Sequence, residues 1–165
     1  MDALLACVGL LAVLHVLYST WTARRLDRLH ARVDAATAAL DRQLRYRAEA
    51  ALAFAPTAAG SAGRDLTAAA TAALEVAGLG HDREAAESAL SRALQSVHGD
   101  VANDGANDAP NEGHSALADV MTRAVFARRF HNDAVRDALT VRRRRIVRWF
   151  RLAGTARLPS FFEMD

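Results

Sequence analysis

The sequence predicts an all-α protein in which an N-terminal single-pass transmembrane helix continues into a long antiparallel up-and-down four-helix bundle. Three observations support this fold class. The chain opens with an apolar run, it is rich in the strong helix formers Ala, Leu, Arg and Glu, and its apolar residues recur at helical spacing. We expect residues 1–23 to cross the membrane and residues 24–165 to form one helical domain, with flexible links at about 56–64 and 99–113.

The apolar run covers Ala3–Ala23. At 1.5 Å per residue, a helix of this length spans roughly 30 Å, which matches the hydrocarbon core of a bilayer. Tyr18 and Trp21 stand where an aromatic interface belt is expected. A secretory signal peptide would carry its basic residues before the apolar run, whereas here they follow it. Cys7 is preceded by only six residues, too few for a lipoprotein signal, so we interpret it as a small residue of the span.

The charges that flank the apolar run predict the orientation of the chain. Arg24, Arg25 and Arg28 follow the run directly, while the other flank carries only Met1 and Asp2. The positive-inside rule places the N-terminus outside and the C-terminal domain in the cytoplasm. All 21 basic residues are Arg, and the chain is rich in Ala. We interpret this composition as the codon bias of a GC-rich bacterial genome, so the predicted location is the bacterial plasma (inner) membrane.

Beyond the apolar run, the same helix is predicted to continue to Ala55, because Pro56 disfavours helical geometry in the residue before it. Its apolar residues lie three, four or seven positions apart and form one stripe: Leu26, Leu29, Val33, Leu40, Leu44, Ala51 and Phe54. Charged residues occupy the other faces, among them Asp27, Asp34, Arg42, Arg45 and Glu49. This stripe needs other helices to cover it.

Three further helices are predicted. Asp65 is expected to cap Leu66–Ala77, and Asp82 to cap Arg83–Val97. The polar segment Gly99–Gly113 is predicted to be a disordered loop. The last helix is expected from Ser115 to about Leu152, with an apolar stripe that includes Leu117, Val120, Met121, Ala124, Ala127, Ala134, Ala138, Val141 and Ile146.

Charge is distributed unevenly along the chain. The segment Arg128–Arg157 holds ten Arg and two Asp, a formal charge of +8, and Asp65–Asp119 holds ten acids and two Arg, a charge of −8. We expect the two segments to attract each other, or the basic one to attract an external anion.

The basic end of the last helix is the main candidate site. It contains Arg142, Arg143, Arg144, Arg145, Arg148 and Trp149. Together with Arg24, Arg25 and Arg28, these residues could bind anionic lipid at the membrane interface. The alternative is a solvated face that pairs with the acidic helices. Nucleic-acid binding is disfavoured because no helix-turn-helix pattern or alternation of aromatic and basic residues is present.

No motif in the sequence predicts an enzyme, a cofactor or a metal site. The spacing His81-x-x-Glu84 could present two ligands, but a metal site needs three or four. A nucleophile elbow and a phosphate-binding loop are both lacking from the sequence.

Three segments in order resemble the LemA family of bacterial membrane proteins: Val33–Ala55 with the run DRQLR, Glu84–Leu94, and Ala127–Thr140 followed by Leu158–Glu163. His131 replaces the tyrosine of the family and Ala50-Ala51-Leu52 its apolar-Pro-Asn step, so the chain would be a divergent member. The resemblance implies one N-terminal span and a cytoplasmic four-helix bundle, and it implies no activity. Where it is closest, we expect Arg128, Arg129 and Asn132 to form a structural polar layer.

The function predicted from the sequence is that of a membrane-anchored scaffold or interaction protein with an unidentified protein partner. The alternative is a protein that binds anionic lipid or organises the membrane through the Arg-rich last helix.

Overall fold

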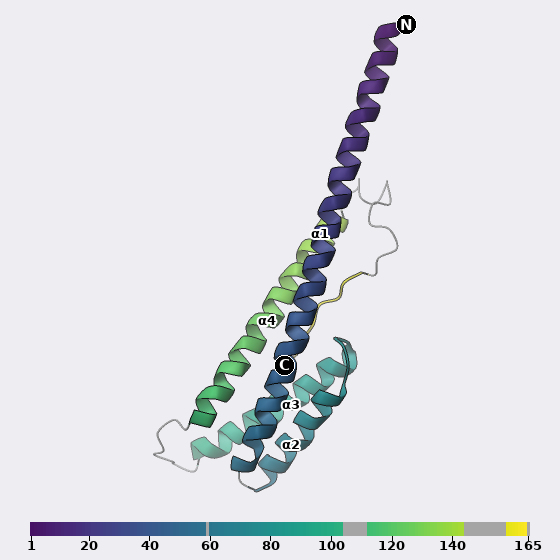
Figure 1. The fold of residues 1–165 in the computed structure, drawn as a ribbon. Helices are drawn as coiled ribbons and strands as arrows, with labels where there is room; N and C mark the ends of the chain where they lie inside the picture. Colours follow the sequence, from purple (N-terminus) through teal and green to yellow (C-terminus); the bar gives the residue numbers. More distant parts are fainter. Residues whose placement is uncertain (59, 104–111, 144–157, 165) are drawn as a thin grey trace. The chain divides into compact units, whose positions relative to one another are not determined.

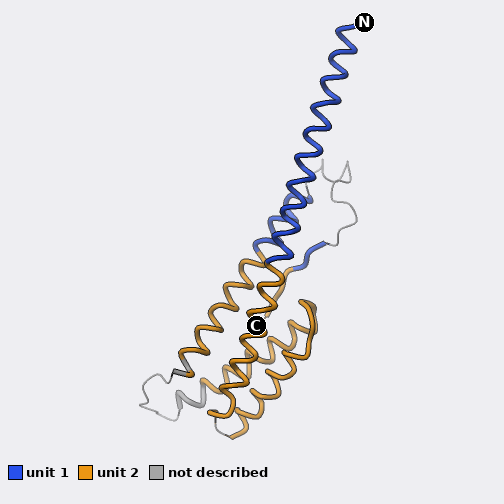
Figure 2. Tube along the Cα trace, in the orientation of Figure 1, with its two compact units in different colours: residues 1–35, 133–160 blue, residues 36–132, 161–165 orange. Residues whose placement is uncertain are grey.

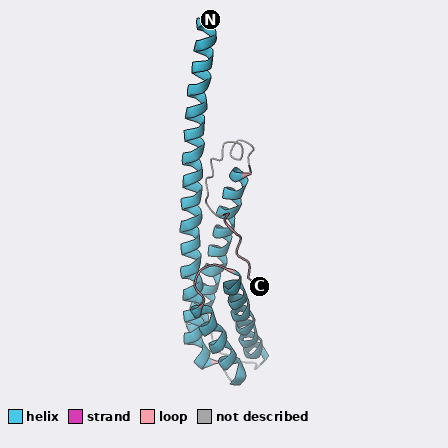
Figure 3. Ribbon diagram, turned by 90° about the vertical axis from the view of Figure 1, so that its right-hand side faces the viewer, coloured by secondary structure: helices cyan, strands magenta, loops and turns pink. Residues whose placement is uncertain are grey.

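The structure is a computed structural model and describes residues 1–58, 60–103, 112–143 and 158–164. The described residues are all-α, as predicted, with four helices and a short 3-10 turn (Figure 1). The helices are α1 (Asp2–Phe54), α2 (Gly60–Glu75), α3 (His81–Asn103) and α4 (Glu112–Arg142). The described residues outside them form turns and an extended C-terminal segment (Figure 3).

The chain divides into two compact units, which we describe separately (Figure 2). Unit 1 consists of residues 1–35 and 133–160, and unit 2 of residues 36–132 and 161–165. Both units therefore take part of α1 and part of α4.

In unit 1, the N-terminal part of α1 carries the apolar run. Among the described residues, one helix is long and apolar enough to cross a membrane, judged by length and composition. Its leucine and valine side chains between Leu4 and Leu17 are 53–71% exposed. Further along α1, Leu26 and Leu29 pack against Val141 of α4, and the Arg32 guanidinium lies 3.2 Å from the Asp137 carboxylate. These two contacts show that α1 and α4 run antiparallel here.

In unit 2, α2 and α3 form a helical hairpin that packs against the end of α1 (Figure 1). The main core combines alanines with a few larger side chains: Ala48, Ala51, Phe54, Ala55, Ala62, Leu66, Ala70, Ala73, Leu90, Leu94, Val97 and Leu117. Small side chains let helices approach closely but bury little area each, so the interfaces must be long. The predicted stripe of α1 is buried, except that Leu29 is half-buried.

The start of α2 differs from the prediction. α1 ends at Phe54 and a 3-10 turn, Ala55–Thr57, follows, as Pro56 requires. α2 then begins at Gly60 rather than at Leu66, so the predicted flexible link is shorter than expected. A Cβ at Gly63 would lie 2.8 Å from the carbonyl oxygens of Ala55 and Ala58. Gly63 is therefore needed for the close approach of the turn and the helix, and is not a sign of flexibility.

The predicted ends of the last two helices also differ from the structure. α3 extends to Asn103 and α4 begins at Glu112, so both ends of the predicted loop, Gly99–Gly113, are helical. α4 is described as far as Arg142, and the rest of the predicted helix, including Ile146, lies almost entirely outside the described residues.

Candidate functional site

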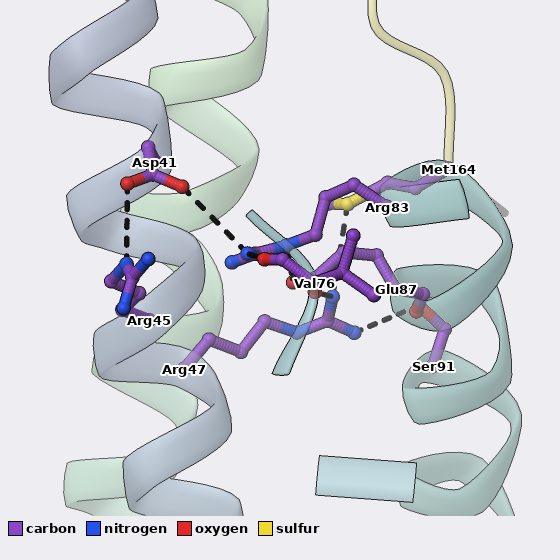
Figure 4. A network of polar contacts seen from close by, with 8 residues as sticks. All are labelled: Asp41, Arg45, Arg47, Val76, Arg83, Glu87, Ser91 and Met164. Carbon is purple, nitrogen blue, oxygen red and sulfur yellow. Dashed lines mark hydrogen bonds and ion pairs between the residues drawn. The ribbon is translucent and has the colours of Figure 1, made fainter. Parts of the chain in front are cut away.

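A buried ion network lies in unit 2, where α1 meets α3 (Figure 4). We use this name for Arg47, Arg83, Glu87 and Ser91. The Glu87 carboxylate accepts a hydrogen bond from Arg47 Nη1 at 2.9 Å and one from Arg83 Nε at 3.0 Å. Arg47 Nη2 donates to Ser91 Oγ at 2.8 Å, and Arg83 Nη1 donates to the Val76 carbonyl at 2.7 Å. Both oxygens of Glu87 are thus engaged by different guanidinium groups.

The burial of this network is unusual for charged side chains. Arg83 and Glu87 are fully buried, and Arg47 is 4% exposed. Charged residues are almost never fully buried unless they are paired. Desolvation by burial raises the pKa of Glu87, although the attraction of Arg47 and Arg83 opposes this rise. Desolvation likewise lowers the pKa of Arg47, against the opposing attraction of Glu87. The cost of removing each charge from water makes every member of the network dependent on its partners.

The buried ion network was not predicted from the sequence, although two signals of it were present. Arg83 and Glu87 are four residues apart, so they share one face of α3. Arg47 lies between Leu44 and Ala51, two members of the apolar stripe that are seven positions apart. A charged residue within a stripe indicates a buried partner, but the sequence does not identify that partner.

The C-terminal segment, residues 158–164, ends in residues 161–164, which belong to unit 2 and dock onto the helices of that unit. The Asn132 side chain bonds both backbone groups of Phe162: its Oδ1 accepts from the Phe162 N–H at 2.9 Å and its Nδ2 donates to the carbonyl at 3.0 Å. The Glu163 N–H donates to Glu84 Oε1 at 3.0 Å. Met164 Sδ accepts from Arg47 Nη1 at 3.7 Å, which connects the segment to the buried ion network.

Phe162 anchors this docking. Its side chain is 1% exposed and packs with Leu40, Leu44 and Ala124, while the neighbouring Phe161 is 41% exposed. The three residues of the predicted polar layer have different surroundings. Asn132 bonds the C-terminal segment, Arg128 is half-buried and lines a cavity in unit 2, and Arg129 is exposed.

The predicted membrane-interface residues that are described lie in unit 1. Arg24 and Arg28 are exposed, and the Arg25 guanidinium lies 5.8 Å from the ring centroid of Trp21. Arg142 and Arg143 follow Val141, which packs against Leu26. The contact therefore brings the described basic end of α4 alongside the basic residues of α1. The other predicted residues, Arg144, Arg145, Arg148 and Trp149, lie outside the described residues.

The hydroxyl of Ser91 is engaged in both directions within unit 2. Ser91 Oγ accepts from Arg47 at 2.8 Å and donates to the Glu87 carbonyl at 3.0 Å. Within the described part of the chain, no group of three or more His, Cys, Asp or Glu residues is placed to hold a metal ion.

Comparisons with known proteins leave the family open. No protein-family model, curated protein or solved structure matches the chain. The resemblance to the LemA family therefore stays a prediction drawn from the sequence.

Proposed function

We propose that the chain is a membrane-anchored interaction protein, in which the N-terminal part of α1 crosses the bilayer and unit 2 serves as a scaffold for a protein partner. The observation that carries the proposal is the exposure of the apolar run, whose leucine and valine side chains are 53–71% exposed. Fully burying one such side chain is worth about 1.5–3 kcal/mol, so a row of them in water is strongly disfavoured. A bilayer would remove that cost.

Two features support a cytoplasmic scaffold. Arg24, Arg25 and Arg28 follow the span, and the positive-inside rule then places the C-terminal part in the cytoplasm of a bacterial cell. Unit 2 also presents large apolar side chains to its surroundings, including Tyr46, Phe126 and Phe130, which are all at least half exposed. Aromatic residues are enriched at protein–protein interfaces. The partner would be a protein captured through unit 2.

The anchor and its orientation can be tested together. We expect the full chain to stay in the membrane pellet after an alkaline carbonate wash and to keep Met1–Asp2 at its N-terminus. A Leu10→Arg, Leu11→Arg variant should move to the soluble fraction, because each Arg at the centre of a span costs about 2.5–3.5 kcal/mol. Alkaline phosphatase fused after Asp165 should be inactive.

A cleaved N-terminus would identify the apolar run as a signal sequence and contradict the anchor. An active phosphatase fusion would reverse the orientation. Cross-linking from native membranes, followed by mass spectrometry, would identify the partner, and cross-links confined to the lipid-facing part of α1 would contradict a scaffold built on unit 2.

A second candidate function, binding of anionic lipid, is favoured by the packing in unit 1. Leu26 and Val141 are both buried in their contact, so Arg142 and Arg143 lie beside the stretch of α1 that holds Arg24, Arg25 and Arg28. Five guanidinium groups would then face one leaflet at the end of the span. Each basic residue near an anionic surface contributes about 1 kcal/mol.

Native mass spectrometry of the full chain in mixed micelles would measure this preference. We expect phosphatidylglycerol to be retained over phosphatidylethanolamine, and the double variant Arg25→Gln, Arg28→Gln to weaken retention roughly tenfold or more, since two charges are lost. The matched control is Arg123→Gln, Arg129→Gln, which removes two exposed charges from unit 2. Equal effects of the two double variants, or equal retention of the two lipids, would contradict lipid binding by unit 1.

A further inference from the structure

A cavity of about 250 Å³ lies in unit 2, next to the buried ion network. Side chains from α1, α3, α4 and the C-terminal segment line it: Arg47, Ser91, Gln95, Met121, Val125, Arg128 and Met164. This lining contains two guanidinium groups, a hydroxyl and a carboxamide, and it contains no carboxylate. Its apolar part is formed by two methionines and a valine.

The two arginines of the lining differ in how they are satisfied. Arg47 is paired with Glu87 at 2.9 Å and bonded to Ser91. Arg128 has no carboxylate within 4.0 Å among the described residues, and its Nε is buried without a hydrogen-bond partner there. The cavity wall therefore carries one positive charge that the described part of the protein does not balance.

The chemistry of the lining defines what would balance it. A guanidinium group presents planar, forked donors that match the two oxygens of a carboxylate or the oxygens of a phosphate. Ser91 and Gln95 add neutral polar groups beside it, and the side chains of Met121, Val125 and Met164 suit a short apolar chain. The volume equals that of roughly eight water molecules, so the ligand must be small.

We propose that this cavity binds a small organic anion, a carboxylate on an aliphatic chain of about four to eight carbons, with the carboxylate on Arg128 and the chain against Met121, Val125 and Met164. Binding of this ligand goes beyond the proposed scaffold function. It requires neither the membrane anchor nor a particular protein partner. Because Met164 forms part of the wall, bound ligand also holds the C-terminal segment against unit 2.

Titration of the full chain in neutral detergent with hexanoate, followed by isothermal calorimetry and by hydrogen exchange of the Glu163 amide, tests the site. We expect saturable binding of one hexanoate per chain and slower exchange at Glu163. Hexanamide, which has the same shape and no charge, should bind at least tenfold more weakly, because charged hydrogen bonds are about twice as strong as neutral ones in such a site. Inorganic phosphate tests the charge without the chain and should also bind more weakly.

Arg128→Gln should weaken hexanoate binding tenfold or more, while the matched control Arg129→Gln, which removes an exposed charge from the neighbouring position, should leave it unchanged. Met121→Ser should weaken hexanoate but not phosphate. The unfolding temperature of Arg128→Gln should be no lower than that of Arg129→Gln. Weaker binding by Arg128→Gln is then a loss of the site and not of the fold. Equal loss in both Arg variants, equal binding of hexanamide, or no saturable binding of hexanoate overturns the proposal.

Discussion

Replacing Arg47 by Met should lower the free energy of unfolding by about 3–5 kcal/mol at neutral pH, the range found when one partner of a buried ion pair is removed. Methionine keeps an unbranched chain of similar shape, so the change isolates the guanidinium. It leaves Glu87, which is fully buried, with Arg83 alone and with one oxygen lacking its 2.9 Å donor. Chemical denaturation of the full chain in detergent, followed by circular dichroism, measures the loss.

The matched control is Arg136→Met. Arg136 pairs with Asp133 at 2.7 Å, closer than Arg47 to Glu87, but the two side chains are 66% and 57% exposed. Exposed ion pairs contribute about 0–1 kcal/mol to stability, so the control should change the free energy of unfolding by no more than that. If both variants lost the same stability, the buried ion network would have no structural role. In the double variant Arg47→Met, Glu87→Gln, we expect a smaller loss than the sum of the single changes, because the two residues interact directly.

The same Arg47→Met variant should show a characteristic dependence on pH. Burial already raises the pKa of Glu87 above its ordinary value of 4.5, and Arg47 is the largest influence that opposes the rise. Without Arg47, the folded-state pKa of Glu87 should rise further. An acid with a raised folded pKa favours the folded state below its unfolded pKa, and this contribution is lost as the pH rises through the folded pKa. The deficit of the variant should therefore be smaller at pH 5 than at pH 8.

Replacing Phe162 by Ala should remove about 3–5 kcal/mol from the docking of the C-terminal segment, as expected for a fully buried phenylalanine. Phe162 packs with Leu40, Leu44 and Ala124, and its backbone is held by Asn132. The loss should be local, so amide exchange reports it better than global unfolding. The amides of Phe162 and Glu163, which donate to Asn132 and Glu84, should lose their protection.

Phe161→Ala provides the control, because it deletes the same side chain from the adjacent, 41% exposed position. It should leave both amides protected. Asn132→Leu should resemble Phe162→Ala. It removes the two hydrogen bonds to Phe162 and replaces the carboxamide by an apolar side chain of similar size. Protection that persists in both Phe162→Ala and Asn132→Leu would show that the segment is held by other contacts.

Several features of the fold could be predicted from local sequence because their causes are local. The break at Pro56 follows from the geometry of one residue and its neighbour, and the apolar stripe of α1 follows from a helical period. The start of α2 could not be predicted in this way. It depends on how closely Gly63 approaches the carbonyl groups of Ala55 and Ala58, a contact between two elements.

The charge pattern illustrates the same difference. Opposite net charges predicted attraction between the acidic segment 65–119 and the basic segment 128–157. Among the described residues, α3 is tied to α1 by two ion pairs, Glu87 with Arg47 and Arg83 with Asp41. Salt screens the attraction between distant, exposed charges. It screens a buried pair much less, so the oppositely charged side chains that face each other in the core matter more than the net charge of a segment.

The sequence by itself determined the length, apolar character and flanking charges of the N-terminal helix, because these depend only on residue types in order. Only the tertiary structure decided which of three neighbouring arginines of α1 is buried. Arg42, Arg45 and Arg47 stand within six positions of one helix, yet Arg42 and Arg45 are exposed and Arg47 is not. The difference is made by Glu87, forty residues away in the chain and 2.9 Å away in space, which supplies the charge that allows a guanidinium to leave water.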